Sequence, residues 1–86
     1  MKNIVKIIEL ENLRAEISRR EVESREGDIR SYYDVEFSRT YVKKSGEAVI
    51  TKTFQHRDHD KLLALVGLSK SKVGDLIRAD REGAER

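Results

Sequence analysis

The hydrophobic period of this 86-residue chain changes near Asp58, and this change constrains the fold more than any other feature. Before it, Tyr33, Val35, Phe37 and Tyr41 recur at period two, which is typical of a half-buried β-strand. After it, apolar residues recur at helical spacing on one stripe, namely Leu62, Leu65, Val66, Val73, Leu76 and Ile77. The pattern predicts a sheet followed by a helical region with Asp58 as its N-cap.

Gly27 and Gly46 mark the turns on either side of this strand. The segment "AVITKTF" after Gly46 alternates again, so the two segments are predicted to form a β-hairpin. A lone hairpin is unstable, so we expect a third strand from about Leu13 to Glu23 and a further strand at residues 3–10. The alternative for the N-terminal segment is an amphipathic helix through Ile4, Ile7, Ile8 and Glu11.

These elements predict one α+β domain over residues 1–86. It consists of an antiparallel β-meander of three to four curved strands at about residues 3–55, a helical region at about 58–81 and a frayed tail at 82–86. The chain contains no Pro, and no repeat or low-complexity tract divides it. A single core is marginal at this length, so we also expect a homodimer.

Composition argues against catalysis and against a membrane or secretory setting. The chain has no Cys and only two His, which excludes disulfides and leaves too few ligands for a zinc site. No nucleophile elbow or Gly-rich phosphate loop occurs, and "HRDH" at residues 56–59 is interpreted as a helix entry loop. The N-terminal apolar run is interrupted by Glu9 and Glu11 before it reaches the length of a signal peptide or membrane span. We therefore expect a cytoplasmic, non-enzymatic protein with no cofactor and no membrane partner.

Charge is unevenly distributed along the chain, although the net charge is only +2. Residues 9–36 carry nine acidic groups against five Arg, a balance of −4, whereas residues 38–57 carry five basic groups against Glu47, a balance of +4. A basic surface that also carries aromatic rings is typical of proteins that bind single-stranded nucleic acid. The alternative is that folding mixes the two halves into an ordinary surface.

The predicted nucleic-acid-binding residues come from the basic segment. Arginine and lysine side chains pair with phosphates, and an aromatic ring stacks on a base. Arg39 is the leading candidate, because a long cation in an apolar strand requires a partner, either an external phosphate or a carboxylate such as Glu36 or Asp34. The complete predicted set is Arg39, Tyr41, Lys43, Lys44, Lys52 and Arg57.

The block "YYDVEFSRTYVKKSGEAVITKTF" followed by "DHDKLLALV" resembles the positive cofactor four family of whirly-type single-stranded DNA-binding proteins. The likeness covers roughly residues 13–77. It implies a curved four-stranded antiparallel sheet, a following helix, and a homodimer formed through the helices and sheet edges. It also implies that Arg39 and Lys52 hold phosphates of single-stranded DNA or RNA and that Tyr41 stacks on a base. The chain departs from the family pattern in its acid-rich first strands and in the extra residues 69–86.

The C-terminal third also resembles a helix-turn-helix at residues 62–78, "LLALVGLSKSKVGDLIR". In that interpretation Gly67 forms the turn, Ser69 caps the second helix, and the residues that enter the major groove of duplex DNA are Lys70, Ser71 and Lys72. One long helix interrupted near Gly67 is the alternative. A third hypothesis is a protein-interaction or assembly module without nucleic-acid affinity, in which the helix stripe and the acidic N-terminal third contact a protein partner.

Overall fold

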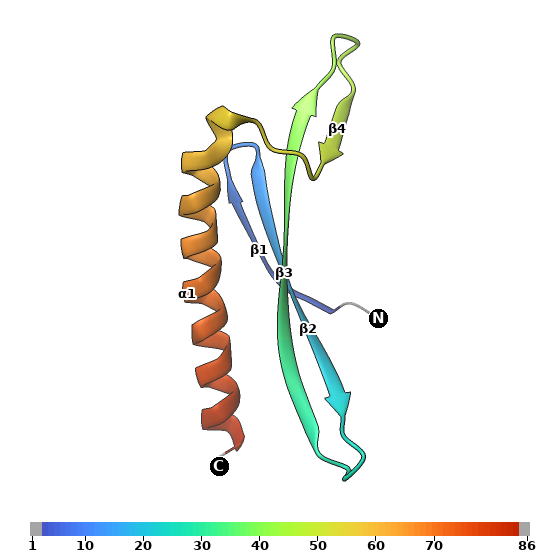
Figure 1. Cartoon of the computed structure of the whole chain (residues 1–86), viewed down its shortest axis with the longest axis vertical. Helices are drawn as coiled ribbons and strands as arrows, with labels where there is room; N and C mark the ends of the chain where they lie inside the picture. Colours follow the sequence, from blue (N-terminus) through green and yellow to red (C-terminus); the bar gives the residue numbers. More distant parts are fainter. Residues whose placement is uncertain (1–2, 85–86) are drawn as a thin grey trace.

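The computed structural model describes residues 3–84 and contains one antiparallel sheet followed by helix. The strands β1 (Asn3–Leu10), β2 (Leu13–Glu23), β3 (Ile29–Val42) and β4 (Ala48–Thr51) lie in the sheet in sequence order. A single 3₁₀ turn, η1 (His56–Asp58), then leads into one long helix, α1 (His59–Ala84) (Figure 1). The predicted α+β class is confirmed.

The strands form where the alternation and the turn residues predicted them. β2 pairs with β3 along its whole length, from Leu13 opposite Arg39 to Glu23 opposite Ile29. Gly27 and Gly46 occupy the two turns with φ of 87° and 89°, a region that favours glycine. The N-terminal segment is strand β1, so the alternative of an amphipathic helix there is wrong.

The core lies between α1 and one face of the sheet (Figure 1). Leu13 and Ala15 of β2 and Leu65 of α1 are at most 1% exposed. Because side chains alternate across a strand, the odd-numbered residues of β2 and of the β3 segment paired with it face α1. Partly buried apolar side chains complete the layer, namely Ile8, Leu10, Val35, Phe37, Phe54 and Leu62.

The molecule is long and thin. Its extents are 53 × 24 × 18 Å, and its radius of gyration is 16.3 Å. A compact chain of this length would have a radius of gyration of about 12 Å. Large apolar side chains remain exposed at Ile29, Ile50 and Leu63, each by 66% or more. The chain therefore buries little apolar surface for its length.

The structure corrects three predicted boundaries. β4 ends at Thr51, so the second hairpin arm is shorter than predicted, and Phe54 reaches the core from the connection that follows. The helical region begins with η1, whose N-cap is Gln55, and Asp58 lies inside η1 as the N3 residue of that capping box rather than at the N-cap. The helix continues past residue 81 to Ala84, and the prediction for residues 85–86 lies outside the described residues.

Of the two alternatives for residues 62–78, the structure has the single long helix and not the helix-turn-helix, and α1 runs without interruption through Gly67 and Gly74. Ser69 is 2% exposed, and its hydroxyl donates to the Leu65 carbonyl at 2.8 Å, a contact made within a helix rather than at its start. Packing of Leu65 in the core with Leu13 and Ala15 offsets the low helix propensity of the two glycines. Despite its length, α1 is too polar to cross a bilayer, and the described chain contains no other α-helix.

Candidate functional site

An open hollow of about 500 Å³ lies where the chain passes from the sheet to the helix. β3 contributes Arg39 and Tyr41, η1 contributes Arg57, and the remaining lining residues are Thr51, Thr53 and Gln55. Three of the six residues predicted to bind nucleic acid therefore line one hollow. The Thr and Gln side chains were not predicted, and the alternation of "AVITKTF" was their only signal, since it places Thr51 and Thr53 on one side of a strand.

Asp58 fixes the geometry beneath this hollow. Its side chain is 4% exposed, and one carboxylate oxygen accepts the backbone N–H of Gln55 at 2.9 Å. The Arg39 Nε lies 3.5 Å from the same oxygen and donates to the Thr53 carbonyl at 3.0 Å. Arg39 thus ties β3 to the connection that leads into α1.

Arg39 does have the partner that a buried cation requires, but the partner is neither Glu36 nor Asp34. It is Asp58, which follows the sheet in sequence. The Arg39 side chain is only 10% exposed, whereas Tyr41 on the same face of β3 is 39% exposed, so this face leaves the core only beyond Arg39. Arg39 therefore has a carboxylate partner, one of the two alternatives that the sequence left open, and its charge is not free for an external phosphate.

Tyr41 presents an exposed aromatic surface at the hollow. The residue is 39% exposed, and the Arg39 guanidinium carbon lies 5.3 Å from the centroid of its ring. This distance is within the range of a cation–π contact, which holds the ring in place. Arg57 is exposed, and among residues 3–84 it has no ion-pair partner. Arg39 and Arg57 carry two positive charges and Asp58 carries one negative charge, so the net charge around the hollow is positive.

The other predicted cations lie elsewhere and mostly have carboxylate partners. Lys43 lies 3.9 Å from Glu47 within the β3–β4 connection, and Lys44 is exposed in the same turn. Lys52 forms an ion pair with Glu36 on the sheet face that points away from α1. The six predicted residues therefore do not share one face of the sheet.

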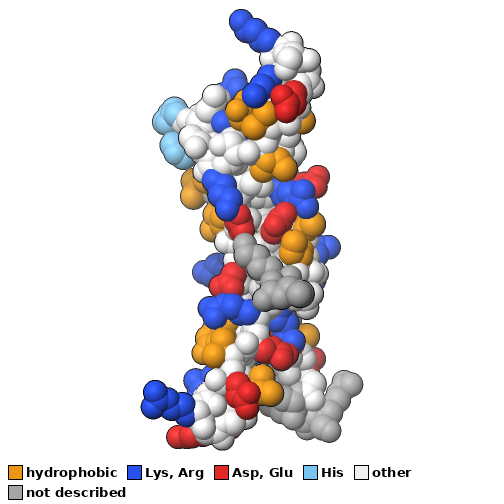
Figure 2. Space-filling model, turned by 90° about the vertical axis from the view of Figure 1, so that its right-hand side faces the viewer, with side chains coloured by type: hydrophobic (Ala, Val, Ile, Leu, Met, Phe, Trp, Pro, Cys, Tyr) orange, Lys and Arg blue, Asp and Glu red, His pale blue; other side chains and the backbone are white. Residues whose placement is uncertain are grey.

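Charges of both signs alternate over the sheet face that points away from α1. Ion pairs join Arg14 to Glu16 at 3.4 Å and Arg20 to Asp34 at 2.8 Å. Figure 2 shows basic, acidic and apolar side chains interspersed along this side of the molecule. Folding has brought the acidic first half of the sequence beside the basic segment, so this face is not a continuous basic surface.

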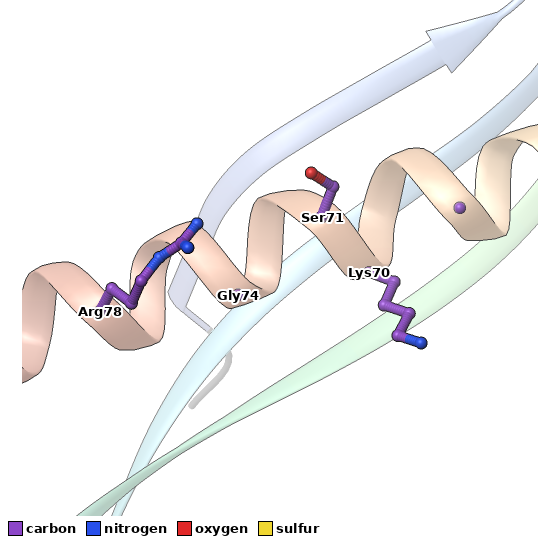
Figure 3. Close-up of a pocket in the computed structure, with 5 residues that line it drawn as sticks. Lys70, Ser71, Gly74 and Arg78 are labelled. Atoms are coloured by element: carbon purple, nitrogen blue, oxygen red, sulfur yellow. The ribbon is translucent and has the colours of Figure 1, made fainter.

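The alternative duplex-binding residues lie on α1. Lys70 and Ser71 line a shallow hollow together with Gly67, Gly74 and Arg78. Lys70 and Ser71 leave the helix in different directions (Figure 3). Lys72 is half-buried. With no second helix in residues 59–84, these side chains do not form the recognition surface that the helix-turn-helix interpretation required.

A second polar cluster joins the C-terminal part of α1 to the sheet. The Tyr33 hydroxyl donates to the Asp80 carboxylate at 2.6 Å, and the Arg19 Nε lies 3.7 Å from the same oxygen. Arg19 also donates to the Ser31 hydroxyl at 2.7 Å. Burial raises the pKa of Tyr33, and so does its hydrogen bond to Asp80. The sequence predicted Tyr33 as a packing residue, and the long-range contact with Asp80 had no local signal.

The "HRDH" segment places its two imidazoles against each other. The rings of His56 and His59 lie edge to face with centroids 5.1 Å apart. No group of three or more His, Cys, Asp or Glu side chains suited to a metal ion occurs in the described part of the chain.

Comparison with known protein families, with curated proteins and with solved structures finds no match for this chain. The functional argument therefore depends on the geometry of its own side chains.

Proposed function

We propose that the protein binds single-stranded nucleic acid, with no catalytic step of its own, at the hollow lined by Arg39, Tyr41 and Arg57. The observation that supports this proposal is the convergence of these three side chains from β3 and η1 on one hollow. They combine the two groups that such binding uses, a cation for the phosphate and an exposed ring for the base.

The roles within the hollow differ from one residue to the next. Arg57 is the exposed cation at the hollow and takes the phosphate. Tyr41 stacks on an unpaired base. Arg39 is a positioning residue, because its charge is engaged by Asp58 and its guanidinium lies against the Tyr41 ring. The hydroxyls of Thr51 and Thr53 and the Gln55 amide offer hydrogen bonds to sugar or base edges.

A single strand fits this site better than a duplex. Stacking on Tyr41 requires a base that is free of its neighbours, as it is in single-stranded nucleic acid. Readout of a duplex requires a helix or β-ribbon that enters the major groove, and α1 packs along the sheet instead (Figure 1).

The test is a fluorescence anisotropy titration with labelled single-stranded and double-stranded oligonucleotides at about 50 and about 200 mM salt. We expect tighter binding to the single strand and weaker binding at high salt. Arg57→Ala should weaken binding and lower the salt slope by about one unit. The matched control is Arg78→Ala, which removes an exposed arginine on α1. Equal affinities of the Arg57→Ala and Arg78→Ala variants would refute the proposed site.

The competing function is a protein-interaction module without nucleic-acid affinity. It is favoured by the mixed charge of the outer sheet face and by exposed apolar side chains on α1, such as Leu63 at 70%. The same titration separates the two functions, because this module would leave both oligonucleotides unbound even at the lower salt concentration.

A further inference from the structure

Strand β3 has an unpaired edge over most of its length. β3 is 14 residues long, but β4 pairs only with Arg39, Thr40, Tyr41 and Val42. Within residues 3–84, the β3 segment 29–38 has β2 on one side and no strand on the other. An open edge of this kind is a template for another strand.

The hydrogen bonds around β3 show which backbone groups point to this edge. Thr40 donates its N–H to the Asn12 carbonyl on the β2 side at 2.9 Å, whereas Lys43 donates to Glu47 on the β4 side at 2.9 Å. The direction of the backbone N–H and C=O groups alternates from residue to residue along an antiparallel strand. The backbone groups of the odd-numbered β3 residues therefore point to the β4 side. The groups at the open edge therefore belong to Ile29, Ser31, Tyr33, Val35 and Phe37.

We propose that a second copy of this chain pairs antiparallel with this edge, about a two-fold axis that passes through Tyr33. In this register Ile29 lies opposite Phe37 of the second copy, Ser31 lies opposite Val35, and Tyr33 lies opposite its own equivalent. All five residues whose backbone groups point to the open edge then pair with one another. A shift of one pair in one direction places Ile29 opposite Arg39, which β4 already occupies, and a shift in the other places Phe37 opposite Gly27 in a turn.

The side chains are complementary in the same register. Arg30 lies opposite Glu36 of the second copy, where a cation and a carboxylate attract across the strands. Ile29, which is 66% exposed, gains an apolar neighbour in Phe37. Glu36 also forms an ion pair with Lys52 of its own chain, so its carboxylate would lie between two cations.

The two edges of the sheet differ in regularity. β1, at the opposite side of the sheet, has a register irregularity between Ile4 and Lys6, whereas the pairing of β3 with β2 is uninterrupted.

The proposed axis is perpendicular to the sheet, so both helices lie on the same face of the joined sheet. Each copy uses its edge once, so assembly stops at two chains. This inference is independent of nucleic-acid binding, because the hollow uses residues 39–57.

The association is tested by sedimentation of the full chain over a concentration series, with Ser31→Pro and Ser31→Ala as a matched pair. Proline removes one outward N–H from an edge position where β2 needs none, whereas alanine removes only the hydroxyl that Arg19 contacts. We expect the wild type and Ser31→Ala to dimerise and Ser31→Pro to dissociate at least about tenfold more readily. A monomeric wild type, or equal dimerisation of the two variants, would overturn the proposal.

The register is tested by single cysteines, since the chain has none of its own. In Tyr33→Cys the two cysteines face each other at about 5.5 Å between Cα atoms, within reach of a disulfide. In Ser31→Cys they are separated by roughly 13 Å along the strand, beyond that reach. We expect a disulfide-linked dimer only from Tyr33→Cys. Equal cross-linking of both variants, or none from Tyr33→Cys, would refute the register, and circular dichroism identifies a variant that has not folded.

Discussion

Arg39 and Asp58 form a buried ion pair that joins the sheet to the start of the helical region, with the Arg39 Nε 3.5 Å from the Asp58 Oδ2. Their side chains are 10% and 4% exposed, so neither charge is well solvated. Removal of one partner leaves the other buried and unpaired, which is the most costly way to disrupt such a pair. The contact therefore serves the stability of the fold as well as the candidate site.

We expect Arg39→Ala to lower the free energy of unfolding by about 3 to 5 kcal/mol, because Asp58 is left without its cation. Urea denaturation measures this loss. Arg57→Ala is the matched control, since an exposed arginine contributes less than about 0.5 kcal/mol. In the double variant Arg39→Ala/Asp58→Ala, the loss should be smaller than the sum of the two single losses. Additive losses would show that the two side chains do not interact.

The raised pKa of the Tyr33 hydroxyl predicts that the protein loses stability at alkaline pH. Burial and the Asp80 hydrogen bond raise its pKa above the ordinary value of 10.0, so the folded protein holds the phenol proton more tightly than the unfolded chain does. This contribution is fully present below pH 10 and is lost as pH rises through the higher folded-state pKa. We expect the urea midpoint to fall above pH 10 and Tyr33→Phe to reduce that fall. An unchanged pH profile in Tyr33→Phe would contradict the assignment.

Local sequence patterns predicted the elements of the fold but not the contacts between them. The alternation of Tyr33, Val35 and Phe37 and the turns at Gly27 and Gly46 depend on neighbouring residues, so one sequence suffices to find them. The pair of Arg39 with Asp58 depends on how the connection after β4 folds back, which no periodicity encodes. For the same reason the sequence predicted a basic sheet face, whereas folding places carboxylates beside several of those cations.

The sequence left open whether residues 62–78 form one helix or two, and glycine substitutions test the continuity of α1. Glycine has a low helix propensity, which disfavours a helix at Gly67 and Gly74. Burial of the apolar stripe of α1 against the sheet nevertheless keeps the helix continuous. A Cβ at either position has nothing within 4 Å, so Gly67→Ala should raise the free energy of unfolding by about 1 kcal/mol. Gly46→Ala is the contrasting variant, because its φ of 89° strains any L side chain. If position 67 were a turn between two helices, Gly67→Ala would destabilise the protein instead.

Substitutions at Tyr41 separate base stacking from hydrogen bonding at the proposed nucleic-acid site. Tyr41→Phe retains the aromatic face and loses the hydroxyl, whereas Tyr41→Leu loses the face and keeps an apolar side chain of similar reach. Stacking of one base contributes about 1 to 3 kcal/mol, so Tyr41→Leu should weaken single-strand binding about 5- to 150-fold. Tyr41→Phe should bind nearly as tightly as the wild type. Anisotropy titrations at one salt concentration measure both, and a loss in Tyr41→Phe equal to that in Tyr41→Leu would assign the contact to the hydroxyl.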